Sequence, residues 1–153
     1  MHVWRICRLS DVDKLSGVGG LYVGGRWHGR GNRILYTSST PSLAALELLV
    51  HLDPASAPAN LSLLEIDIPD KIRIEHCIPS QITPNWQNFP FPLELQNFGS
   101  TWLVEKRTAI LSVPSAIIPR ENNILINPVH FDASLITIKD EIPFAYDPRL
   151  QHH

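Results

Sequence analysis

The segment RILYTSSTPSLAALELLVHL, residues 33–52, contains the clearest helix signal in the sequence. Ser39 or Thr40 can cap this helix, Pro41 is suited to its first turn, and Ser42–Leu52 supplies its body. A short strand is predicted directly before the cap. A strand that leads straight into a helix can turn side chains from both elements toward one site.

Between residues 43 and 50 of this helix, every side chain is apolar except that of Glu47. A helix that is apolar on all sides is buried, so we expect Glu47 to be buried with it. An unpaired buried carboxylate costs several kcal/mol, because an ion has left water without a partner. Two interpretations are open: a salt bridge to a buried arginine, or a carboxylate at the floor of a cleft, where it can act on a substrate.

Strand signals outnumber helix signals in the rest of the chain. We expect one further helix at Ser100–Leu111, ended by Pro114, after a long loop over residues 79–98. The predicted strands are residues 3–7, 33–37, 61–68, 71–77, 117–118, 124–126 and 135–138. Because no repeat, linker or low-complexity tract interrupts this pattern, it predicts a single α+β domain over residues 1–153, rich in strands and with few helices.

Composition and charge exclude several classes of protein. The chain has 153 residues, of which 44% are hydrophobic and 18% charged, enough for one domain with a real core. Its 13 basic and 15 acidic residues give a net charge of −2, which argues against direct binding to nucleic acid. No apolar run is long enough for a signal peptide or a membrane span, so we expect a cytoplasmic protein without membrane contact.

The cysteines and histidines lack the spacing of a metal site. Cys7 and Cys77 are typical of buried thiols in a reducing compartment. The seven histidines are scattered, and none forms an i, i+4 pair beside a third ligand. We therefore expect neither a metal ion nor a prosthetic group.

Arginines in two early segments are candidates for phosphate binding. Arg5 lies on a predicted strand, on the same face as small apolar residues. Arg26 lies in Gly24–Trp27, within residues 17–31, which hold seven of the eight glycines. Guanidinium groups match phosphate geometry, and two of them can hold a pyrophosphate. The alternative is that both arginines pair with carboxylates of their own chain.

Tyr36 and Ser115 are further candidates. Tyr36 lies on the strand before the helix of Glu47, so both side chains can face one cleft, where a tyrosine can stack on a flat ring or donate a hydrogen bond. Ser115 lies where we expect the chain to leave a helix, a place for a cap or a ligand contact. A triad of Ser115, His130 and a carboxylate is the alternative, although no Gly-x-Ser-x-Gly elbow is present. The glycine segment also lacks the Gly-x-Gly-x-x-Gly fingerprint of dinucleotide-binding folds.

Taken together, these segments resemble the RES family. The resemblance is carried, in order, by Arg5, Gly24-Gly25-Arg26-Trp27, Tyr36-Thr37-Ser38, Leu43-Ala44-Ala45-Leu46-Glu47, Pro114-Ser115, Asn123-Ile124-Leu125-Ile126-Asn127-Pro128 and Asp147-Pro148-Arg149-Leu150. It spans nearly the whole chain. His28 is a departure, because the family usually has Asn after the Arg-Trp pair.

The resemblance implies a fold similar to ADP-ribosyltransferases, with a central cleft for NAD+ as substrate. It also implies a toxin of a bacterial toxin–antitoxin system that inhibits growth by cleaving the nicotinamide–ribose bond, by hydrolysis or phosphorolysis. In this family the arginines hold the pyrophosphate, the tyrosine packs against nicotinamide or its ribose, and the glutamate favours the positive charge that develops as nicotinamide leaves. The implied catalytic residues are Glu47, Arg26 and Tyr36, and the implied NAD+-binding residues are Arg5, Arg26, Tyr36, Ser115 and Asn127.

Two other functions fit the same residues. One is a mono-ADP-ribosyltransferase that modifies a specific cellular protein, and the other is a non-catalytic module that binds a nucleotide or an antitoxin. The resemblance further implies an antitoxin partner with an Xre-like helix-turn-helix domain, whose C-terminal part blocks the cleft. An exposed apolar patch around Trp86, Phe89 and Phe91 would suit that partner.

Overall fold

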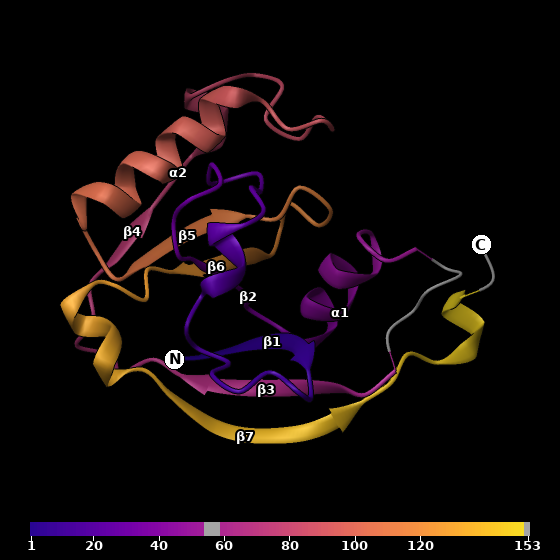
Figure 1. The fold of residues 1–153 in the computed structure, drawn as a ribbon. Coiled ribbons are helices and arrows are strands. Elements are labelled where there is room, and N and C mark those ends of the chain that lie inside the picture. Colours follow the sequence, from indigo (N-terminus) through magenta and orange to yellow (C-terminus); the bar gives the residue numbers. More distant parts are fainter. Residues whose placement is uncertain (54–58, 152–153) are drawn as a thin grey trace.

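The computed structural model describes residues 1–53 and 59–151, and its frame is a seven-stranded sheet in the order β4-β5-β6-β2-β1-β3-β7 (Figure 1). The strands are β1 His2–Arg8, β2 Leu35–Ser38, β3 Leu61–Asp67, β4 Ile74–His76, β5 Ile110–Pro114, β6 Asn122–Ile126 and β7 Thr137–Phe144. The helices are α1 Pro41–Leu49 and α2 Leu93–Glu105, with short 3-10 helices at Val18–Leu21, Pro79–Gln81, Phe131–Leu135 and Pro148–Gln151. Only β4 and β5 pair in parallel among the strands described. The expected α+β class is confirmed.

The sheet divides into two halves between β1 and β2. In the described chain a single residue pair, Trp4 with Ser38, joins these strands, whereas β1 pairs with β3 over seven positions and β2 with β6 over four. Next to that pair, a side chain makes the hydrogen bond to β2: Arg5 donates from NH1 to the carbonyl oxygen of Tyr36 at 3.0 Å. This short ladder lets the Arg5 side chain reach the strand that carries Tyr36 and leads into α1.

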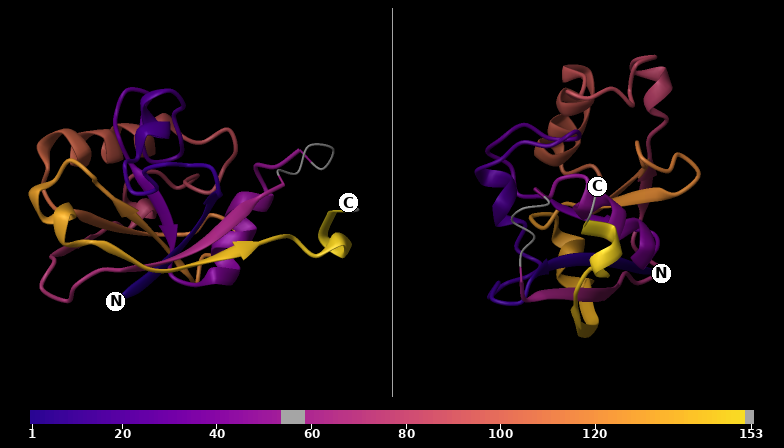
Figure 2. Two further views of the ribbon diagram at one scale, coloured as in Figure 1. Left: turned by 60° about the horizontal axis from the view of Figure 1, so that its bottom comes forward. Right: turned by 90° about the vertical axis from the view of Figure 1, so that its right-hand side faces the viewer.

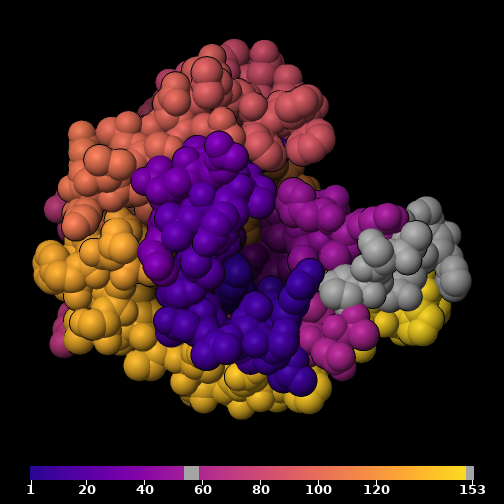
Figure 3. All heavy atoms as spheres, in the orientation of Figure 1, coloured from indigo at the N-terminus to yellow at the C-terminus, as the bar shows by residue number. Residues whose placement is uncertain are grey.

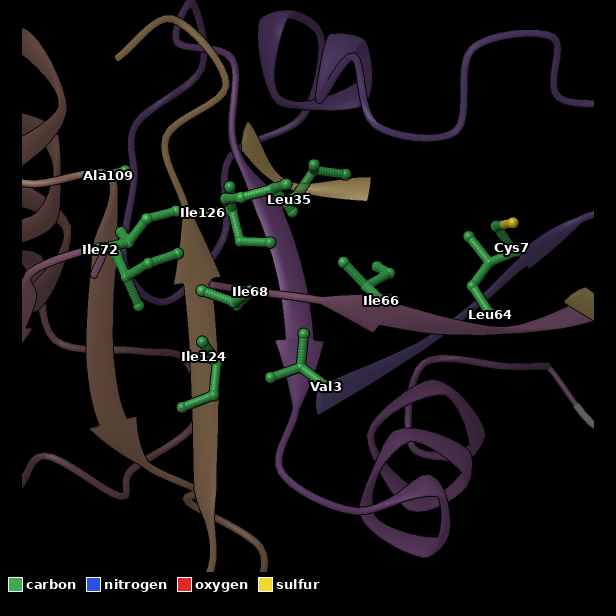
Figure 4. Packing of buried hydrophobic residues seen from close by; sticks show 12 residues of the cluster. Val3, Cys7, Leu35, Leu64, Ile66, Ile68, Ile72, Ala109, Ile124 and Ile126 are labelled. Carbon is green, nitrogen blue, oxygen red and sulfur yellow. The ribbon is translucent and has the colours of Figure 1, made fainter. Parts of the chain in front are cut away.

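The main hydrophobic core lies between the two halves of the sheet. Figure 4 shows Val3 and Ile66 from β1 and β3 pointing into the same space as Leu35 and Ile126 from β2 and β6, while Leu64 lies farther along β3 in the same cluster. All five are at most 2% exposed. Complete burial of each such side chain contributes about 1.5–3 kcal/mol to the free energy of unfolding, so this core holds the halves together where the ladder does not.

Each helix covers a different half. Helix α2 lies on the side of the sheet formed by β4 and β5 (Figure 1), and its Leu95, Trp102 and Leu103 pack with Leu111 and Leu125 of β5 and β6. Figure 2 shows β3 and β7 side by side along the opposite edge, where they pair in antiparallel fashion.

The other helix, α1, packs through Ala44 on Ile6 and Leu61 of β1 and β3. After β7 the chain returns to this helix, and the Tyr146 hydroxyl donates to the carbonyl oxygen of Ala45 at 2.5 Å. The position of α1 is therefore fixed by the β1–β3–β7 half and by the C-terminal segment.

The second helix predicted from the sequence was misplaced. We expected it at residues 100–111, but α2 spans Leu93–Glu105, so its first turns fall in the expected loop. It ends at Lys106, whose φ of 51° is left-handed. The apolar run that follows is the buried strand β5. A short apolar run is compatible with a buried helix as well as with a buried strand, so its sequence alone did not distinguish the two. Pro114 consequently ends a strand and not a helix.

Other boundaries also differ from the expectations. The expected strand at residues 117–118 is a turn, β4 is only three residues long, and β7 is longer than the predicted 135–138. The capped helix starts as predicted, with Thr40 as its cap, but ends at Leu49. It is not buried on all sides, because Leu46 and Val50 are 37% and 59% exposed.

Gly99 brings α2 against the backbone of Trp27, and this approach leads to a stability prediction. A Cβ at Gly99 would lie 1.7 Å from the carbonyl oxygen of Trp27. We expect Gly99→Ala to lower the free energy of unfolding by about 1–3 kcal/mol, the usual cost of overpacking, as measured by urea denaturation. Gly19→Ala is the control, because nothing lies within 4 Å of a Cβ there. Equal stabilities of the two variants would contradict this packing.

Candidate active site

Glu47 is anchored at the junction of α1 with the ends of β5 and β6. Because β2 runs directly into the capped helix, Glu47 lies in the second turn of α1, beside the start of β6 and the end of β5. Its Oε1 accepts hydrogen bonds from Ser115 Oγ at 2.8 Å and from Asn123 Nδ2 at 2.5 Å. The side chain is half-buried. Both described donors use Oε1, which leaves Oε2 able to accept from a ligand.

The two donors to Glu47 are themselves oriented. Ser38 Oγ donates to Asn123 Oδ1 at 2.9 Å, which turns the amide nitrogen of Asn123 toward the carboxylate. Ser115 Oγ accepts from the backbone N–H groups of Ile117 and Ile118, both at 3.0 Å, so its own proton is available to Glu47. The side chain of Glu47 is therefore anchored by neutral donors and not by a cation.

The alternative of a salt bridge is not what the structure shows. Within residues 1–53 and 59–151, no Lys, Arg or His nitrogen lies within ion-pair distance of Glu47. Arg26 is nevertheless close: burial lowers the pKa of its guanidinium, while the charge of Glu47 raises it. Glu47 and Arg26 thus share one electrostatic environment without neutralising each other by direct contact.

Arg26 is held by the backbone of a distant segment. Its NH1 donates to the carbonyl oxygens of Trp86 at 2.6 Å and Asn88 at 3.0 Å, and its guanidinium lies 5.4 Å from the ring centroid of Phe91. These contacts use NH1 only, so NH2 and Nε can still donate to an anion. Nothing in the sequence marks these partners, since two of them are carbonyl groups of a loop.

Tyr36 supports the glycine-rich segment through His28. The Tyr36 hydroxyl accepts from the Trp27 backbone N–H at 3.2 Å and lies 2.8 Å from His28 Nδ1, and His28 Nε2 lies 2.9 Å from the carbonyl oxygen of Val23. A carbonyl only accepts, so Nε2 carries the proton and Nδ1 accepts from Tyr36. Burial raises the pKa of Tyr36 and lowers that of His28, and both groups stay neutral near pH 7.

Arg5 extends from β1 toward the backbone of β2. Its NH1 binds the carbonyl oxygen of Tyr36, but its buried Nε has no hydrogen-bond partner among the described residues. Burial lowers the pKa of Arg5. A buried N–H without a partner is costly, and a bound anion would satisfy it.

Asn127 and His130, also predicted from the sequence, lie away from this group. Asn127 is completely buried, donates from Nδ2 to the carbonyl oxygen of Leu103 at 3.1 Å, and follows the far end of β6 from Asn123, about 13 Å along a strand. His130 Nδ1 accepts from the Asp132 N–H, and no hydrogen bond in the described chain joins it to Ser115. The Ser115–His130 triad is therefore not formed.

The group that the structure does assemble is Arg5, Arg26, Tyr36, Glu47 and Ser115, with Asn123 and Ser38 added. The sequence did give a signal for Asn123, which is one of two consecutive asparagines before an apolar strand. Figure 3 shows the surface hollowed between the N-terminal segment and the segment that includes α1. A separate cavity of about 340 Å³, lined by Leu35, Ile126 and His130 among others, includes none of these seven residues. The described residues contain no group of three His, Cys, Asp or Glu side chains placed to hold a metal ion.

Comparison with known proteins gives a family for this arrangement. The family model of the RES domain matches residues 2–147. The chain belongs to the RES domain family. A curated relative from Sphingobium sp. (strain YBL2), named Prs ADP-ribosylating toxin, is 41% identical over 152 residues, covering 96% of this chain and 94% of its own. Proteins named Toxin Res from Pseudomonas putida and Yersinia enterocolitica are 40% and 37% identical and cover 98% and 99% of the chain, at 99% and 100% of their own lengths.

A solved structure agrees with the fold of the RES domain. The crystal structure of the M. tuberculosis MbcT-MbcA toxin–antitoxin complex contains a chain that superposes with a TM-score of 0.70, covering 98% of this chain and 86% of that one. Only 16% of the aligned residues are identical, so this likeness concerns the fold. No helix in the described residues is long and apolar enough to span a membrane.

His28 gives the site a predicted acid sensitivity. Because burial lowers its pKa from 6.5, the unfolded chain binds a proton more readily than the folded one, and stability is lost as the pH falls below about 6.5. In His28→Asn, Asn Oδ1 can replace Nδ1 as acceptor for Tyr36 but does not titrate. We expect the free energy of unfolding to fall less between pH 7 and pH 5 in this variant than in wild type, as measured by urea denaturation. The other ionisable groups are common to both proteins, so identical losses would show that His28 does not contribute.

Proposed function

We propose that this RES domain cleaves the bond between nicotinamide and ribose in NAD+ and acts as the toxin of a toxin–antitoxin pair. The observation that carries the proposal is the Glu47 carboxylate, which Ser115 and Asn123 fix through one oxygen, while its charge acts on the Arg26 guanidinium without an ion pair. Such an arrangement fits a ligand that presents hydroxyl groups to the Glu47 carboxylate and negative charge to the Arg26 guanidinium. NAD+ has both, in its ribose and in its pyrophosphate.

In the proposed reaction, Glu47 stabilises charge that develops in the transition state. Oε2 accepts from a hydroxyl of the nicotinamide ribose, and the carboxylate favours the positive charge that appears at the anomeric carbon. The carbon–nitrogen bond breaks and its electron pair leaves with nicotinamide. An acceptor oxygen then bonds to the same carbon and loses its proton. NH2 and Nε of Arg26, together with Nε of Arg5, are the donors available for the pyrophosphate.

The acceptor separates two versions of this function. Hydrolysis or phosphorolysis would deplete NAD+, whereas transfer to a protein would modify a target. The name of the Sphingobium relative, Prs ADP-ribosylating toxin, favours transfer as the second candidate. The Tyr36 hydroxyl binds Trp27 and His28, so its ring is the part of the side chain that would pack against nicotinamide or its ribose.

Glu47→Gln tests the proposal directly. The amide oxygen can still accept from Ser115 and Asn123, so the fold should survive, but the negative charge is lost. We expect nicotinamide release from NAD+ to slow by at least ~100-fold, the scale for loss of one preorganised group, and growth inhibition on expression to disappear. Glu94→Gln is the matched control, because Glu94 is an exposed carboxylate on a helix with no described partner.

The same assay identifies the acceptor. Nicotinamide release by pure protein with NAD+ alone would indicate water, and stimulation by inorganic phosphate would indicate phosphorolysis. Release that requires a lysate protein, which becomes labelled with ADP-ribose, would indicate transfer. If Glu47→Gln inhibits growth as strongly as wild type, the domain acts by binding and the enzymatic proposal fails.

We also propose an antitoxin partner that covers the site, with an Xre-like helix-turn-helix domain. The apolar patch expected around Trp86, Phe89 and Phe91 is smaller than predicted, because Trp86 and Phe91 are half-buried and only Phe89, at 77%, is largely exposed. Val50, the C-cap residue that follows α1, is a further exposed apolar residue.

This partner leads to a prediction of its own. Phe89→Ser and Val50→Ser should each weaken the complex with the product of a neighbouring gene about 10-fold, the effect of removing one buried apolar contact, as measured by calorimetry. Ile78→Ser, at an exposed position before the Pro79–Gln81 helix, is the control. If no neighbouring product suppresses growth inhibition, the proposal of an antitoxin fails.

A further inference from the structure

We infer that helix α2 is a positioning element for the nucleotide site, and that Gln96 and Ser100 are positioning residues that hold Arg26 in place. The inference rests on the proposed function, because it assumes that Arg26 binds NAD+. Neither residue belongs to the segments that carry the family resemblance. Both act on the backbone of the glycine-rich segment and not on the ligand.

Two hydrogen bonds join α2 to the backbone on either side of Arg26. Gln96 Nε2 donates to the carbonyl oxygen of Gly25 at 2.9 Å, and Ser100 Oγ accepts from the N–H of Gly29 at 2.8 Å. Between them, Gly99 lies directly against the carbonyl of Trp27, with no room for a Cβ. The three helix residues therefore contact the segment before, within and after the turn that carries Arg26.

Helical spacing explains why one helix can do this. Positions 96, 99 and 100 are three and four residues apart, so they lie on one face of α2. Leu95, Trp102 and Leu103 of the same helix are buried with β5 and β6. The helix is consequently fixed by the sheet on one side and transmits that position to the glycine-rich segment on the other.

The glycine-rich segment needs such support, because ordering each residue costs about 1–2 kcal/mol in backbone entropy and glycine loses the most. From the opposite side, the Trp27 N–H is held by Tyr36. With Gln96 and Ser100 removed, the hydrogen bonds that the described residues still give the peptide groups next to Arg26 are that contact with Tyr36 and the short pairing between Gly25 and His28.

The two functions of the site have separate supports. Glu47 is anchored by Ser115 and Asn123, which follow or belong to the strands, and neither touches α2 through a described hydrogen bond. Loosening the contacts of α2 should thus impair substrate binding by Arg26 and leave the chemical step at Glu47 intact. A merely structural role would not produce this separation.

The test measures nicotinamide release from NAD+ by the full chain carrying Gln96→Ala, Ser100→Ala or both. We expect KM for NAD+ to rise about 3- to 10-fold in each single variant, the effect of one lost hydrogen bond, and further in the double variant, with kcat within about twofold of wild type. Asn97→Ala and Thr101→Ala are the controls, because these exposed residues of α2 have no described contact with the segment. Ser100→Thr keeps the acceptor oxygen and should restore KM.

A second measurement, amide hydrogen exchange of residues 24–29, does not depend on activity. We expect faster exchange in the Gln96 and Ser100 variants than in the controls. Unchanged exchange, an unchanged KM or a loss confined to kcat would each overturn the inference. If wild type releases no nicotinamide, the proposed function fails, and the exchange rates alone then decide whether α2 holds the segment.

Discussion

The separation of β1 from β2 is the constraint on which the rest of the molecule depends. A continuous ladder here would bury the backbone of Tyr36 and leave no room for a charged side chain. Because one residue pair alone joins the strands, the guanidinium of Arg5 can reach the carbonyl of Tyr36, and an apolar core takes over the task of holding the two halves together. The Arg5 side chain thus supplies a hydrogen bond to β2 where the short ladder between β1 and β2 does not.

The charged groups of the site, Glu47 and Arg26, are each held by uncharged hydrogen-bond partners. A half-buried carboxylate could be stabilised most directly by an arginine, and Arg26 is close enough for its pKa to respond to Glu47. Instead, serine and asparagine donors hold the carboxylate, and carbonyl groups of the segment around Trp86 hold the guanidinium. Opposite charges that are kept near each other by separate partners remain available to a ligand, whereas a closed ion pair would have to be broken first.

Sequence patterns predicted the parts of this structure that are determined locally. The cap at Thr40, the start of α1 and the strands β1 and β3 depend on residues adjacent in the chain, and they lie close to where the patterns placed them. The end of the second helix was placed too far along the chain, because the apolar run at the beginning of β5 fits a helix as well as a strand until its burial is known. Burial is a property of the assembled layers, so local patterns could not supply it.

The candidate site shows the same division between local and long-range information. Glu47 stood out as the only carboxylate of an apolar helix, yet its partner Ser115 is 68 residues away, and only the family resemblance brought the two together beforehand. The carbonyl partners of Arg26 and the backbone contacts of α2 leave no trace in side-chain chemistry, because any residue can offer a peptide group. Glu47 could thus be recognised from the apolar sequence around it, whereas the groups that hold Arg26 could be identified only from the structure. A loop rich in glycine has little side-chain packing of its own to fix it, and its precision must come from neighbours that are already rigid.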